Sequence, residues 1–148
     1  MCEPYLIGFN YARPVEPDAF TTGPPRSQEA SKYYHPAYNM RALRDAVPFR
    51  MIYDYYSLGL VLLEIGLWET IDGIRTKSSH DLKSKIIETK VPPLRHVMGT
   101  AYRDAVAACL QDGITQDSPE TYGDTILDFQ RLVVEAVVRP ILRPDENR

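Results

Sequence analysis

The side chains best suited to chemistry in this 148-residue chain are widely separated along the sequence. Three histidines, His35, His80 and His96, and two cysteines, Cys2 and Cys109, belong to the residue types that ligate metals or act as nucleophiles. None of them falls into a spacing typical of a zinc site, and two cysteines are too few for a disulfide framework. The spacing leaves open whether the chain folds the histidines together. We therefore predict no metal site from the sequence.

One carboxylate, Asp54, lies near the start of the most apolar stretch, Met51 to Trp68. In that place it could act as a helix N-cap. The stretch is nearly long enough to cross a membrane, but Asp54 and Glu64 interrupt it, and its longest uncharged piece, Tyr55 to Leu63, is far too short. We therefore expect no membrane span, and instead a helix that is buried on every side at the centre of a domain.

Charge and composition exclude several classes of function. The chain has 17 basic and 20 acidic residues, a net charge of -3, and no basic run, so we expect no nucleic-acid partner. Residues 1–10 lack the basic and apolar regions of a secretory signal, which predicts an intracellular, cytoplasmic protein.

The rest of the pattern predicts a mainly α fold with a long irregular start. Seven of the 12 prolines fall in the first third, where residues 5–9 could form one short strand and residues 10–48 show no periodicity. After Pro48 the sequence turns helical. Besides the central stretch, we expect a helix with Ser79 as its N-cap that runs to about Thr89, and a second with Thr100 as its N-cap that runs through Gln111. A last helix should run from Thr121 or Asp124 to Arg139, where Pro140 would end it. The apolar face of that last helix would comprise Ile126, Phe129, Val133, Val134 and Val137.

Three blocks of sequence resemble the C-terminal lobe of protein kinases, in the order and spacing of that family. Residues Tyr53–Glu64 read YDYYSLGLVLLE, which is similar to the family's central helix. Residues Tyr33–Tyr38, YYHPAY, resemble the Ala-Pro-Glu end of the activation segment, with His35, Pro36 and Ala37 at the motif. Residues Leu6–Arg13, LIGFNYAR, stand where kinases have Asp-Phe-Gly, with Gly8, Phe9 and Asn10 at the motif. Downstream, Tyr102–Leu110 resembles the helix before the last one of the lobe.

The amino-acid sequences of these blocks are most similar to those of degenerate fungal kinase-like domains. Many such domains accompany prion-forming or incompatibility proteins. The resemblance implies that residues 1–148 form a single, partial C-lobe. Residues 1–48 would be an activation-segment-like region, and residues 49–148 a helical subdomain.

The departures from the family pattern imply that the lobe has no catalytic residues. Gly8 replaces the aspartate that would hold Mg²⁺, and Asn10 replaces the glycine of the same motif. Ala37 replaces the glutamate that pairs with a late arginine, and no arginine occurs between Gly113 and Tyr122. We therefore expect no cofactor. ATP and magnesium would bind only if a missing N-lobe and catalytic loop completed the site.

The resemblance also assigns expectations to individual side chains. Asp54 would anchor the catalytic loop in a kinase. Because that loop is absent here, we expect Asp54 to reach solvent, a new donor or another protein. Several residues lie where an activation segment is phosphorylated, but without a nearby arginine cluster the interpretation of an ordinary polar loop is favoured. These residues are Thr21, Thr22, Ser27, Ser31 and Tyr33.

Three functional hypotheses follow. The first is a non-catalytic pseudokinase lobe that serves as an interaction or regulatory module in fungal signalling or self-recognition, with a protein partner covering apolar surface near Ile7, Phe9 and the start of the central helix. The second is a fragment of a larger ATP-dependent protein kinase whose other parts are encoded elsewhere. The third is an unrelated helical interaction domain, which a simple up-down bundle would favour.

Overall fold

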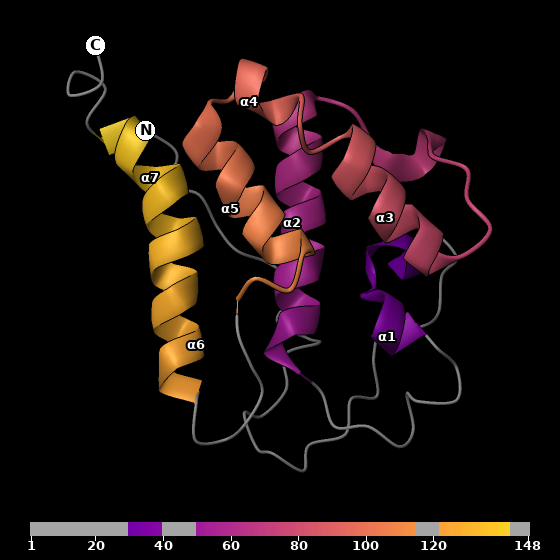
Figure 1. Cartoon of the computed structure of the whole chain (residues 1–148), viewed down its shortest axis with the longest axis horizontal. Coiled ribbons are helices and arrows are strands. Elements are labelled where there is room, and N and C mark those ends of the chain that lie inside the picture. Colours follow the sequence, from indigo (N-terminus) through magenta and orange to yellow (C-terminus); the bar gives the residue numbers. More distant parts are fainter. Residues whose placement is uncertain (1–29, 40–49, 115–121, 143–148) are drawn as a thin grey trace, which may run out of the picture.

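The computed structural model describes residues 30–39, 50–114 and 122–142, and every regular element in these ranges is a helix (Figure 1). The prediction of a mainly α fold is therefore confirmed, while the strand predicted at residues 5–9 lies outside the described ranges. In chain order the elements are η2 (Ala30–Tyr33), α1 (Pro36–Asn39), α2 (Met51–Leu67), η3 (Ile71–Gly73), α3 (Ser79–Thr89), α4 (Leu94–Val97), α5 (Thr100–Leu110), α6 (Tyr122–Phe129), η5 (Gln130–Val134) and α7 (Glu135–Leu142).

Helix α2 lies at the centre of the described structure, with α5 packed against it and the α6–α7 rod on the far side of α5 (Figure 1). Its buried side chains form the larger core cluster with residues of α3, α4 and α5. This cluster comprises Tyr56, Leu60, Leu63, Ile71, Leu82, Ile86, Val91, Leu94, Tyr102, Val106 and Leu110. A second cluster joins Tyr55 of α2 to α5 and the C-terminal rod through Ala105, Cys109, Ile114 and Val133.

Two glycines allow α2 to approach its neighbours closely. A Cβ atom at Gly59 would lie 2.7 Å from Cβ of Cys109, and one at Gly66 would lie 2.6 Å from Cδ2 of Leu94. Because neither glycine has a side chain, α5 packs against the backbone of α2 at Gly59, and α4 packs against it at Gly66.

The expectation that α2 is buried on every side is wrong. Asp54 is exposed, and Val61, Ile65 and Trp68 are 42%, 52% and 89% exposed. Apolar composition alone does not tell which sides of a helix find neighbours, and here the other helices pack on only part of its circumference.

The helix ends show which local signals act. The N-cap of α3 is Ser78 rather than Ser79, and its side chain accepts a hydrogen bond from the backbone N–H of Asp81 at 3.1 Å. The N-cap of α5 is Gly99 rather than Thr100, because the backbone there has φ 86°, which favours glycine. Helix α4 was not predicted; Pro93 stands at its N-cap, where its missing N–H costs nothing.

The C-terminal rod extends past its predicted end. It continues through Pro140 to Leu142 and contains a π-helical turn, η5, between α6 and α7. Val133 is buried and Phe129 packs against the second cluster, as expected, but Ile126 is 51% exposed.

Part of the first third is regular, contrary to the prediction of an irregular segment. Residues 30–33 form η2 and residues 36–39 form α1, and both lie beside the core. Pro36 stands at the first position of α1, where its fixed φ favours a helix start.

Candidate functional site

The described residues bring three charged or titratable side chains together from distant parts of the chain. His35 Nε2 lies 3.3 Å from Oδ1 of Asp112, and Lys83 Nζ donates to Oδ2 of Asp112 at 2.7 Å. Lys83 Nζ also lies 3.4 Å from His35 Nε2. We call these three residues the polar cluster. They join the turn before α1 to helix α3 and to the end of α5.

Hydrogen bonds fix the protonation of the histidine in the polar cluster. The backbone N–H of Ala37 donates to His35 Nδ1 at 3.2 Å, so the ring proton belongs on Nε2, which faces Asp112. Burial lowers the pKa of His35 below its ordinary value of 6.5, and the Lys83 ammonium lowers that pKa further, while Asp112 opposes both. His35 is therefore neutral at neutral pH.

Aromatic rings enclose this histidine. The Tyr53 ring stacks on His35 with centroids 5.3 Å apart, and the Tyr56 ring meets it edge to face at 5.1 Å. Lys83 Nζ lies 5.6 Å from the centroid of Tyr56, within cation–π range. Since the polar side chains of the cluster contact one another, and His35 Nδ1 accepts from the backbone of Ala37, the arrangement is suited to holding segments together.

A second connection links the same segment to α2. Tyr33 Oη donates to the Glu64 carboxylate at 2.9 Å, and Ser57 Oγ donates to the carbonyl of Tyr33 at 2.8 Å. Glu64 also accepts the backbone N–H of Ile71 at 2.8 Å. Burial, followed by the neighbouring Glu64, raises the pKa of Tyr33 to about 12. The Glu64 carboxylate thus accepts hydrogen bonds from two neutral donors.

The structure places the residues singled out from the sequence in different surroundings. His35 and Pro36 are buried, Ala37 is half-buried, and Asp54 is exposed in the first turn of α2. Tyr33 and Ser31 lie in η2. Outside the described residues are Gly8, Phe9, Asn10, Thr21, Thr22 and Ser27.

Ala37 has no carboxylate, although the kinase resemblance implies a glutamate at this position. The segment that contains Ala37 nevertheless contacts the chain after α5. The contact runs from His35 to Asp112, which has a left-handed backbone with φ 56°. Sequence reasoning missed Lys83 and Asp112 because they lie 48 and 77 residues from His35.

The exposed side of α2 forms an apolar surface that ends in an aromatic ring. Two rows of residues at seven-residue spacing, nearly two helical turns, make up this surface. One row is Asp54, Val61 and Trp68, and the other is Leu58 and Ile65. We call these five residues the α2 strip. Leu58 is half-buried and the other four are exposed. The seven-residue spacing is present in the sequence, but it does not show by itself which row faces outward.

Trp68 stands out within the α2 strip. It follows the last helical residue with φ 56° and ψ 33°, a left-handed conformation that glycine adopts at far lower cost. Its backbone N–H donates to the Glu64 carbonyl and closes the helix, and the residue is 89% exposed. A large aromatic side chain is thus presented to solvent at a position that favours glycine.

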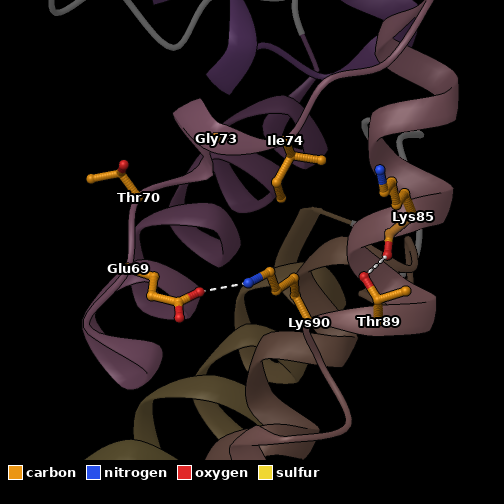
Figure 2. A pocket seen from close by; sticks show the side chains of 7 residues that line it. All are labelled: Glu69, Thr70, Gly73, Ile74, Lys85, Thr89 and Lys90. Carbon is orange, nitrogen blue, oxygen red and sulfur yellow. Dashed lines mark hydrogen bonds and ion pairs between the residues drawn. The ribbon is translucent and has the colours of Figure 1, made fainter.

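A shallow pocket of about 500 Å³ lies between the η3 region and the end of α3 (Figure 2). Its polar groups mostly satisfy one another. Lys90 Nζ contacts Glu69 Oε2 at 2.5 Å, and Thr89 Oγ1 donates to the carbonyl of Lys85 at 2.7 Å (Figure 2). Because these polar groups already have partners, they are poorly suited to orient a ligand, and we do not assign the pocket a function.

Other classes of site find no support in the part of the chain that the structure describes. No group of three or more His, Cys, Asp or Glu side chains in these ranges is arranged to hold a metal ion. None of the described helices has the length and apolar character required to cross a bilayer. Burial raises the pKa of the Cys109 thiol to about 12, which keeps it protonated and unreactive.

Comparisons with protein-family models, with curated proteins and with solved structures returned no match for this chain.

Proposed function

We propose that this chain is a non-catalytic, kinase-like helical lobe that acts as a protein-interaction or regulatory module in signalling or self-recognition. The observation that carries the proposal is the α2 strip. A central helix normally directs its apolar residues inward, whereas this one directs Val61, Ile65 and Trp68 to solvent. Exposed apolar surface of this kind marks interaction sites in soluble proteins.

The arrangement of the helices supports the kinase-like part of the proposal. The described helices are grouped around α2 and do not form a simple up-down bundle (Figure 1). The resemblance implies a bond between the end of the activation segment and the chain after the penultimate helix. The contact between His35 and Asp112 joins those same two places with different residues.

The non-catalytic part rests on side-chain chemistry. Gly8 has no side-chain carboxylate to coordinate Mg²⁺ at the position that the resemblance aligns with the metal-binding aspartate. Phosphoryl transfer depends on metal ions that neutralise the developing charge. A lobe with glycine at this position retains the framework of a kinase without this part of its chemistry.

Isothermal titration with Mg-ATP tests the proposal directly. We expect no saturable heat of binding, while an active protein kinase titrated under the same conditions gives a normal isotherm. Saturable binding of Mg-ATP to this chain would overturn the proposal and favour the interpretation as a fragment of a larger kinase.

A further inference from the structure

We infer that the partner of the α2 strip is a second copy of this chain, whose α2 packs antiparallel to the first about a two-fold axis at Val61. The inference rests on the proposed use of α2 as a binding surface and specifies what it binds. Three observations support it: the spacing of the strip, the chemistry of its ends and its charges. The area of the strip sets the expected strength of the association.

The spacing of the α2 strip is symmetric about Val61. Asp54 lies seven residues before Val61 and Trp68 lies seven residues after it. When two such helices pack antiparallel with Val61 against Val61, Asp54 of one copy lies level with Trp68 of the other. Leu58 then lies near the partner's Ile65, because these residues stand three and four positions from the centre. Steps of three and four residues are the spacing with which two helices pack side by side.

The two ends of the strip are chemically complementary. The Trp68 indole N–H is a hydrogen-bond donor, and the Asp54 carboxylate is an acceptor with room for more than one donor. Among the described residues, none forms a hydrogen bond with the Trp68 indole. Antiparallel packing places one donor beside one acceptor at each end of the interface. Parallel packing would instead bring the two Asp54 carboxylates together.

Charges beyond the strip favour the same direction. Arg50, exposed at the N-terminus of α2, lies near the level of the partner's Glu69 in an antiparallel pair. Glu69 is exposed and directly follows Trp68, and because one of its oxygens already contacts Lys90, the partner's Arg50 would be its second cation. The positive N-terminal end of each helix dipole then faces the negative C-terminal end of the other.

The area of the strip predicts a weak dimer. Helix α2 has 17 residues and is therefore about 25 Å long, so a strip about 10 Å wide covers roughly 250 Å² per copy. Stable complexes bury about 800 Å² per partner. We expect a reversible, concentration-dependent association.

The fluorescence of Trp68 gives a direct readout, because it is the chain's single tryptophan. We expect sedimentation equilibrium of the full chain to show a monomer–dimer equilibrium. Trp68 emission should shift to shorter wavelength as the protein concentration rises, since the partner copy excludes water from the indole. A monomer at every concentration, with unchanged emission, would overturn the inference. Blue-shifted emission that does not change on dilution would also overturn it, because another part of the same chain would then cover the strip.

Paired variants show whether the strip forms the contact. Val61→Lys should abolish the dimer, because two ammonium groups would meet at the two-fold axis. Leu127→Lys is the matched control: Leu127 is 67% exposed on α6 and stands two residues, about 200° around the helix, from Phe129, which stacks on Tyr55. It should leave the dimer intact, and circular dichroism checks that both variants fold. Equal loss of the dimer in two folded variants would count against the strip.

Cysteine cross-linking determines the direction of packing. In a Cys2→Ser background, Val61→Cys should form a disulfide-linked dimer on mild oxidation, because each copy presents residue 61 to its own equivalent. Asp54→Cys should not, since the two residues would be separated by about 14 residues of helix, roughly 21 Å. Cross-linking of both variants indicates parallel packing, and cross-linking of neither excludes the contact. Either result overturns the inference, while the Mg-ATP titration decides the proposed function independently.

Discussion

At the scale of single residues, the polar cluster makes stability depend on pH. The folded-state pKa of His35 is lowered by burial and by Lys83, with a smaller contribution from Arg50 and an opposing one from Asp112; the uncharged rings of Tyr53 and Tyr56 enclose it. Protonation of Nδ1 also breaks the hydrogen bond from the backbone of Ala37.

Because the unfolded chain binds a proton at His35 more readily than the folded chain, stability rises with pH across this titration. We expect neutral His35 to make its full contribution to the free energy of unfolding above pH 6.5. This contribution should be lost progressively as the pH falls from 6.5 towards the lower folded-state pKa of His35. Chemical denaturation at a series of pH values measures it. His35→Gln should flatten the profile in this window, whereas His80→Gln, at an exposed position on α3, should leave it unchanged. An unaltered profile in His35→Gln would show that other groups are responsible.

At the scale of the elements, the start of α3 distinguishes two adjacent serines. Ser78→Ala should lower the free energy of unfolding by about 1 kcal/mol, because the N–H of Asp81 loses its acceptor. Ser79→Ala, one residue later and inside the helix, should change it by less than about 0.5 kcal/mol. Thermal denaturation followed by circular dichroism compares them. Equal effects would mean that the Ser78 hydroxyl is not the cap.

The contact between α2 and α5 gives a second prediction at this scale. Gly59→Ala should destabilise the protein by about 1–3 kcal/mol, because the new methyl group would meet Cβ of Cys109, which moves only with its backbone. Gly66→Ala should cost less, since the nearest atom is the terminal carbon Cδ2 of Leu94. Gly73→Ala is the control, because no atom lies within 4 Å of its added Cβ. Urea denaturation measures all three, and a Gly59→Ala variant as stable as the control would contradict the close packing.

At the scale of the whole molecule, the two core clusters should unfold together. Leu62 and Val137 pack against both clusters, so a substitution that loosens the packing of one cluster also destabilises the other. Leu60→Ala, at a fully buried position, should cost about 2–5 kcal/mol while keeping a single transition. Leu58→Ala, at a half-buried position, should cost less. Two separate transitions, seen by denaturation with two spectroscopic probes, would contradict this.

The sequence predicts the parts of this fold that depend on local patterns. The apolar run of α2, Ser79 at the start of α3 and Thr100 at the start of α5 each indicate a helix within a residue or two of where it begins. The polar cluster depends on contacts between residues 29 to 77 positions apart, which no local pattern encodes. The outward side of α2 was also unpredictable, because apolar composition does not tell which neighbours a helix will meet.

The π-helical turn in the C-terminal rod leads to an expectation about deletions. Phe129, Val133 and Val137 recur in steps of four, which in a regular α-helix would drift around the axis by about 40° per step. The wider turn of η5 compensates for this drift and keeps the three side chains on the core. Removal of the exposed Arg131 would shorten the first step to three residues, and a regular α-helix would then present the same side chains inward. A deletion inside a helix usually destroys its packing, but this one should leave a folded protein with near-normal helix content.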